Sequence, residues 1–155
     1  MLRPFVFDRK VFVLGNSMGG FLAVMFARRL KATVCVAFSP QYSIDPSLVK
    51  DRRWQSYRSQ IHSIRFRSID IFFDKSIRYY LFFGDELNER EHYVNLLDCP
   101  ASWVFVLFNQ GHNLVKELKE KGVLYGLVYK CFSGVKRDLI SNFLVEEGFH
   151  VLCSE

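Results

Sequence analysis

Four short stretches of the chain consist almost entirely of apolar residues, and each is followed by a turn containing glycine, proline or asparagine. Continuous apolar runs of this length are typical of parallel strands that are covered on both faces. Segments whose apolar residues have helical spacing follow three of the four runs. Alternating strands and helices predict βαβ units, so we expect an α/β fold with a mainly parallel four-stranded sheet flanked by helices. The expected strands are residues 11–14, 33–38, 77–83 and 103–108, and the expected helices are residues 18–30, 88–97 and 113–121.

The hydrophobic pattern breaks down between the second and third predicted strands, over residues 41–74. We therefore expect residues 41–74, called the insertion below, to be an addition to a single domain that covers residues 1–155. One further helical pattern lies around residues 135–145. Apolar residues make up 50% of the chain, and this proportion excludes an intrinsically disordered protein.

A Gly-x-Ser-x-Gly motif, residues 15–19, lies between the first predicted strand and the first predicted helix. In that context the motif predicts a nucleophile elbow, a tight turn that exposes a serine hydroxyl above the sheet. Ser17 would be the nucleophile, and Gly15 and Gly19 would leave room for its strained backbone. The simpler alternative is a glycine turn followed by a serine that caps the helix.

Two further polar residues come directly after later predicted strands: Asp85 follows the third and His112 follows the fourth. Because ligands bind at the carboxyl ends of parallel strands, we expect both residues to lie near Ser17. His112 would take the proton of Ser17 and pass it to the leaving group, while the carboxylate orients the imidazole. The backbone N–H of Met18 would be one donor of an oxyanion hole. The alternatives are that His112 is a surface loop residue and that Asp85 is a helix N-cap.

The strand, motif, helix and later polar residues of Val11–Lys121 resemble those of the α/β-hydrolase family. The resemblance implies a partial α/β-hydrolase fold and a serine hydrolase that cleaves an ester or thioester through an acyl-enzyme on Ser17. In such proteins the acid often follows the glycine at the strand end as Gly-x-x-Asp, and that offset falls on Leu87 here. The acid must therefore come from a neighbouring position. The favoured acid and its two alternatives are, in that order, Asp85, Glu86 and Glu89.

The chain also departs from the family, whose members place several strands ahead of the elbow strand. Only ten residues precede Val11, so residues 11–14 are expected to form an exposed edge of the sheet. Either the chain is the C-terminal portion of a longer protein, or a second copy or a partner chain covers this edge, or the chain is an inactive remnant. The alternatives to a hydrolase are therefore a non-catalytic interaction module and an acyltransferase that uses the same triad.

Composition narrows the expected partners. The net charge is +5, and Lys and Arg residues of the insertion are interleaved with aromatic residues. The resemblance implies that the insertion is a cap over the site. Its basic residues fit an acidic or phosphorylated substrate, a nucleic-acid surface or a solvated face; the last is favoured, and nucleic acid is not expected.

The remaining chemistry-bearing residues indicate no further site. The four cysteines and four histidines are dispersed, so we expect neither a metal nor a cofactor, and a reducing compartment is favoured. No apolar stretch reaches the length of a membrane span. We expect a cytoplasmic protein that acts on a small-molecule ester or thioester.

Overall fold

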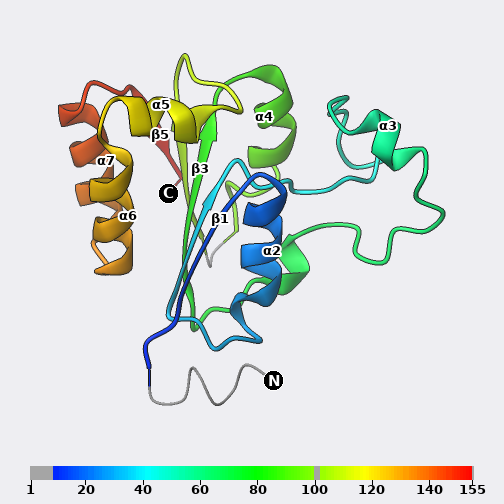
Figure 1. The fold of residues 1–155 in the computed structure, drawn as a ribbon, viewed down its shortest axis with the longest axis horizontal. Helices are drawn as coiled ribbons and strands as arrows, with labels where there is room; N and C mark the ends of the chain where they lie inside the picture. Colours follow the sequence, from blue (N-terminus) through cyan, green and yellow to red (C-terminus); the bar gives the residue numbers. More distant parts are fainter. Residues whose placement is uncertain (1–8, 100–101, 155) are drawn as a thin grey trace.

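The computed structural model describes residues 9–99 and 102–154, which form one sheet with helices on both faces (Figure 1). The strands follow one another across the sheet in chain order, and the first four are parallel. This arrangement confirms the expected α/β class with a mainly parallel sheet, consistent with part of an α/β-hydrolase fold. The strands are β1 (Phe12–Asn16), β2 (Val34–Phe38), β3 (Arg78–Gly84), β4 (Ser102–Leu107) and β5 (Val151–Cys153).

The fifth strand corrects the expected count of four. β5 pairs antiparallel with β4, through three residues from Phe105 to Leu107. Its own three residues, near the end of the chain, are too few to show a hydrophobic period. Only the pairing with β4, which lies far away in sequence, identifies the segment as a strand.

Helices form at the four predicted positions, although their bounds differ by a few residues. Two helices were not predicted: α3 (Gln55–Arg58), a single turn within the insertion, and α6 (Leu124–Phe132), which follows the turn at Gly122, where φ is 75°. The sequence of α6 contains three aromatic residues, one valine and a glycine, all of which have lower helix propensity than alanine or leucine. The helices are α2 (Met18–Ala27), α3 (Gln55–Arg58), α4 (Leu87–Tyr93), α5 (Leu114–Glu120), α6 (Leu124–Phe132) and α7 (Arg137–Glu146), with a 3₁₀ helix at Asp70–Phe72.

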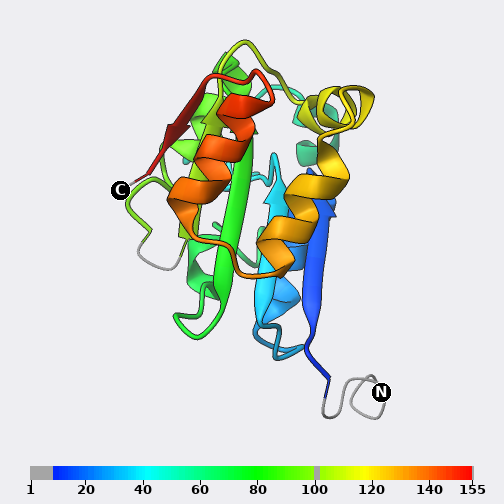
Figure 2. The same cartoon turned by 90° about the vertical axis from the view of Figure 1, so that its left-hand side faces the viewer.

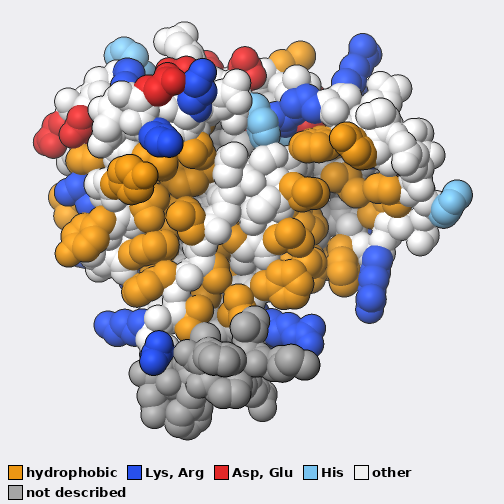
Figure 3. Space-filling view, viewed as in Figure 1, with side chains coloured by type: hydrophobic (Ala, Val, Ile, Leu, Met, Phe, Trp, Pro, Cys, Tyr) orange, Lys and Arg blue, Asp and Glu red, His pale blue; other side chains and the backbone are white. Residues whose placement is uncertain are grey.

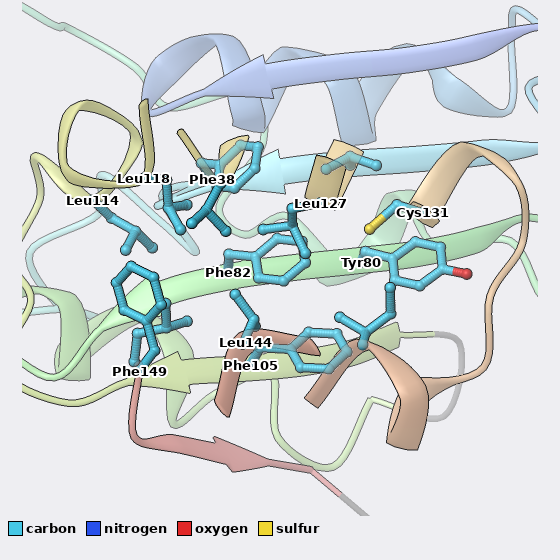
Figure 4. Close-up of a cluster of buried hydrophobic side chains, with 14 of the residues drawn as sticks. Phe38, Tyr80, Phe82, Phe105, Leu114, Leu118, Leu127, Cys131, Leu144 and Phe149 are labelled. Atoms are coloured by element: carbon cyan, nitrogen blue, oxygen red, sulfur yellow. The ribbon is translucent and has the colours of Figure 1, made fainter. Parts of the chain in front are cut away.

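The sheet separates two hydrophobic layers. Helices α5, α6 and α7 cover one face, and α2 and α4 cover the other (Figures 1 and 2). Neighbouring residues of a strand point to opposite faces. In β3, Tyr80 and Phe82 therefore pack under α5–α7, as Figure 4 shows, whereas Tyr79, Leu81 and Phe83 pack on the other side.

β1 lies at an edge of the sheet, as expected, and its apolar side chains are only partly covered. Phe12 is 37% exposed and Leu14 is 52% exposed. Hydrophobic side chains gather on both sides of this strand, over α6 and over α2 (Figure 3). None of the helices described is long and apolar enough to cross a membrane.

Candidate catalytic site

Ser17 occupies the turn between β1 and α2 in a conformation that side chains rarely adopt. Its φ is 55° and its ψ is −124°. The turn is so tight that a Cβ on Gly15 would lie 2.1 Å from the carbonyl oxygen of Gly19, so residue 15 must be glycine. A Cβ on Gly19 itself would meet no described atom within 4 Å, so contact with the described residues does not explain the second glycine of the motif. The N–H of Ser17 donates to the carbonyl of Phe38 over 2.8 Å and ties the turn to the end of β2.

The turn brings Ser17 to His112, although the two residues lie 95 positions apart in the chain. The Ser17 hydroxyl oxygen is 2.9 Å from Nε2 of His112. The other ring nitrogen, Nδ1, is 2.8 Å from Oε1 of Glu89. A carboxylate only accepts hydrogen bonds, so Nδ1 carries the proton and Nε2 is free to accept the Ser17 hydroxyl proton. Serine, imidazole and carboxylate thus form one continuous line of hydrogen bonds.

Asp85, the acid favoured from the sequence, is not the carboxylate that hydrogen-bonds to the imidazole. Asp85 does not contact His112 in the described residues; its Oδ1 accepts the backbone N–H of Gln110 over 3.2 Å. The short side chain therefore braces the loop that carries His112. Glu86 is exposed, and its carboxylate lies beside Gly111. Of the two alternatives to Asp85, Glu89 is the carboxylate that reaches the imidazole.

Glu89 has this position because of the helix that carries it. It lies in the first turn of α4, and its side chain is only 1% exposed. His92, three residues later, lies on the same buried face of α4. A carboxylate and a histidine three residues apart, next to the apolar Tyr93 and Leu96, form the one sequence signal that points to a buried polar face of this helix.

Gln41 is a site residue that the sequence did not reveal. It follows the end of β2, is only 3% exposed, and its Nε2 is 3.0 Å from the Ser17 hydroxyl oxygen. The hydroxyl oxygen accepts this hydrogen bond while its own proton points to His112. Gln41 lies at the start of the insertion, where no periodicity distinguishes one polar residue from another.

The insertion contributes a second polar group that contacts the carboxylate. Arg53 donates from Nη1 to Oε1 of Glu89 over 2.6 Å and binds both carboxylate oxygens of Asp51. Oδ2 of Asp51 also accepts from Nε2 of His92 over 2.9 Å. The other ring nitrogen of His92 accepts the N–H of Tyr42 over 3.0 Å. The charged group Glu89, Arg53 and Asp51 thus connects α4 to the insertion, and His92 connects it to the backbone next to Gln41.

These contacts decide the charges of the buried groups. Burial alone would raise the pKa of Asp51, but the hydrogen bonds from Arg53 and His92 outweigh it and lower the pKa to about 2. Burial would also raise the pKa of Glu89. The hydrogen bonds to its carboxylate and the charge of Arg53 outweigh burial, so the pKa of Glu89 lies below its usual value. Both groups are therefore carboxylates at neutral pH. Burial lowers the pKa of His92 and keeps its imidazole neutral.

The basic residues of the insertion lie around a separate hollow. A cavity of about 830 Å³ is lined only by residues between Asp45 and Arg67, and its basic lining residues include Lys50, Arg52 and Arg58. Arg67 pairs there with Asp45 over 2.8 Å. Within the described residues, no cluster of His, Cys, Asp and Glu has the arrangement of a metal site.

Comparisons with known proteins give a likeness to solved structures but none to a family model. No protein-family model matches the sequence, and no curated protein matches it. Among solved structures, one described as the structure of a thermophilic esterase is similar to this chain, with 14% identity and a TM-score of 0.43. The matched region covers 91% of this chain and 68% of that one.

Acid should destabilise the protein through its buried ionised groups. The folded-state pKa of Asp51, about 2, lies below its ordinary value of 3.8, so the unfolded chain binds the proton more readily. The stabilisation is complete above about pH 4, amounts to about 2 kcal/mol, and is lost as the pH falls through 2. Glu89 acts in the same direction, and the lowered pKa of His92 adds a loss that starts below pH 6.5.

Urea unfolding at a series of pH values checks this expectation. Asp51→Asn should cost more unfolding free energy at neutral pH than in acid, where the wild-type carboxylate is itself protonated. A cost that is equal at every pH would show that the Asp51 charge does not stabilise the fold.

Proposed function

We propose that the chain is a serine hydrolase that cleaves an ester or a thioester through an acyl-enzyme on Ser17. The observation that carries the proposal is the line of two hydrogen bonds, 2.9 and 2.8 Å long, from Ser17 through His112 to Glu89. A serine hydroxyl is a weak nucleophile until a base within hydrogen-bond reach removes its proton. Here the base is in reach, and a buried carboxylate holds its tautomer.

Each residue of the line has a distinct role. His112 Nε2 accepts the Ser17 proton as the oxygen attacks the acyl carbon, and the resulting imidazolium returns that proton to the departing alcohol or thiol. Water then attacks the acyl-enzyme with His112 again acting as the base. Glu89, rather than Asp85, stabilises the imidazolium in both steps. Gln41 fixes the hydroxyl so that its proton faces His112.

The oxyanion that forms on the acyl group needs its own donors. Met18 is the first residue of α2, so its N–H has no acceptor within the helix and is available to a ligand. The positive end of the helix dipole adds to this donor. Ser17 is partly exposed, which leaves a path for a substrate to the hydroxyl.

The substrate side of the proposal rests on the position of the insertion. Its start carries Gln41, and Arg53 contacts Glu89, so the insertion borders the line of polar residues and fits the place of a cap. A small acyl substrate would enter beside it. An acyltransferase would use the same residues. It would differ from a hydrolase only in that the insertion lets an acceptor other than water reach the acyl-enzyme.

A fluorophosphonate probe should label the wild-type protein, because the probe reacts covalently with an activated serine hydroxyl. Ser17→Ala should abolish the label, and Ser133→Ala, which changes an exposed serine at the end of α6, should leave it intact. In-gel fluorescence and intact-protein mass measure the label. Folded wild-type protein that stays unlabelled would contradict the proposed activity.

The two candidate acids give opposite expectations. Glu89→Gln should lower kcat/KM for an activated ester such as p-nitrophenyl acetate by roughly 10³-fold, since the imidazole loses its orienting charge. Asp85→Asn keeps an oxygen that accepts the Gln110 N–H, so kcat/KM should change less than about 10-fold, as expected of a group that only braces a loop. A larger loss in Asp85→Asn than in Glu89→Gln would restore Asp85 as the acid.

The exposed edge favours a second candidate function, a non-catalytic module that binds a partner chain or another copy along β1. An apolar groove of about 340 Å³ runs beside this strand and is lined by Leu14, Gly15 and Asn16 of β1 together with residues of α5 and α6. Unpaired strand edges with apolar flanks are ready templates for pairing.

Sedimentation velocity separates this candidate from the enzyme. If the edge mediates assembly, wild-type protein should sediment as an oligomer, and Leu14→Lys should shift it to the monomer without changing fluorophosphonate labelling. A wild-type monomer at all concentrations would remove self-association as a function of the edge.

A further inference from the structure

A single oxygen of the proposed catalytic acid is shared between the base and the insertion. Oε1 of Glu89 is 2.8 Å from Nδ1 of His112 and 2.6 Å from Nη1 of Arg53. Arg53 is held by Asp51, whose two carboxylate oxygens it contacts at distances from 2.7 to 3.0 Å. The side chains of Glu89 and Asp51 are 1% and 2% exposed, so water screens these charges weakly.

The charges of this buried group do not cancel. Glu89 and Asp51 are both carboxylates, and His92 is neutral. Within residues 9–99 and 102–154, Arg53 is the one cation that contacts these carboxylates. The group therefore carries one net negative charge while His112 is neutral. When His112 accepts the serine proton, the sum becomes zero. Two more carboxylates lie near the His112 loop, those of Asp85 and Glu86, but they contact Gln110 and Gly111 at its base.

We propose that Arg53 and Asp51 of the insertion are positioning residues that set how readily His112 takes up a proton. The effect of these residues on catalysis rests on the proposed hydrolase function. Arg53 holds Glu89 in place and offsets part of its charge, whereas Asp51 restores the negative balance that favours an imidazolium. The insertion is thereby part of the acid–base apparatus as well as a wall of the site.

The two residues act with opposite sign, which a purely structural role would not produce. Arg53→Met removes a positive charge, so His112 should take up its proton at a higher pH than in the wild type. Asp51→Asn removes a negative charge, so His112 should take up its proton at a lower pH than in the wild type. Both variants remove hydrogen bonds from the same buried group. If they acted only by making this group less rigid, both would shift the His112 titration midpoint in the same direction.

Two measurements follow these changes. The first is the midpoint of the His112 titration, read from the pH-dependent chemical shift of its ring protons and assigned with His112→Gln. The second is the acid limb of the pH profile of kcat/KM, which should move with the same sign as the midpoint in each variant. Asp51→Asn should also lower the plateau of the profile, since a weaker base removes the serine proton less readily.

Two control variants keep the test interpretable. Arg53→Lys retains the charge and should keep the wild-type midpoint even if Arg53→Met fails to fold, as judged by circular dichroism. Arg67→Met removes an arginine of the insertion that pairs with Asp45 outside this group, and it should leave the midpoint unchanged. Agreement of both controls with the wild type supports a local charge effect.

The possible results separate this inference from the proposed function. Opposite shifts of the titration midpoint support the inference, whether or not the protein reacts with the fluorophosphonate probe. Two results would overturn the inference even in a protein that the probe labels. One is a shift of the same sign in Arg53→Met and Asp51→Asn, and the other is a shift in Arg67→Met as large as that in Arg53→Met.

Discussion

The shared carboxylate oxygen of Glu89 is the interaction on which the rest of the site depends. Oε1 accepts from His112 and from Arg53, so one buried atom joins α4, the loop after β4 and the insertion. A carboxylate with 1% exposure keeps its charge only when hydrogen-bond donors and a nearby cation replace its lost hydration. The two donors therefore hold the charge, and the charge in turn holds the imidazole toward Ser17.

The serine is positioned by a steric constraint of a different kind. The close approach of Gly15 to the Gly19 carbonyl forces the chain from strand to helix within a few residues and leaves Ser17 with a positive φ. Such a conformation costs free energy, and it persists because neighbouring structure fixes it. The hydrogen bond from the Ser17 N–H to Phe38 and the one from Gln41 to the hydroxyl provide that fixation from β2.

The parts of the fold that follow from local pattern could be predicted from the sequence. Buried parallel strands must be apolar on both faces, so β2, β3 and β4 are visible as continuous runs. The motif around Ser17 and the position of His112 after β4 are likewise local signals. The acid is not, because Asp85, Glu86 and Glu89 all follow β3 within five residues, and the choice depends on where α4 begins and which way its first turn faces.

The contacts of the insertion could be predicted from the sequence even less well than the acid. Arg53 contacts Glu89, which lies 36 positions further along the chain, and Gln41 contacts Ser17, which lies 24 positions before it. These polar pairs carry no period and no spacing rule, because each is fixed by the three-dimensional path of a segment with little regular structure. Only the hydrogen-bond accounting of buried charges in the folded chain reveals them.

Ser17 can be held in a fixed position although β1 has an open edge, because the contacts that hold the Ser17 turn all come from the covered side of β1. β1 is half-exposed along its length, whereas every residue of β2 is buried. The contacts that set the Ser17 turn come from β2, the segment after it and the loop after β4, all on the covered side of β1. The geometry of serine, imidazole and carboxylate therefore does not depend on what pairs with the outer edge of the sheet. An additional strand there would add stability to β1, and it would leave the line from Ser17 to Glu89 unchanged.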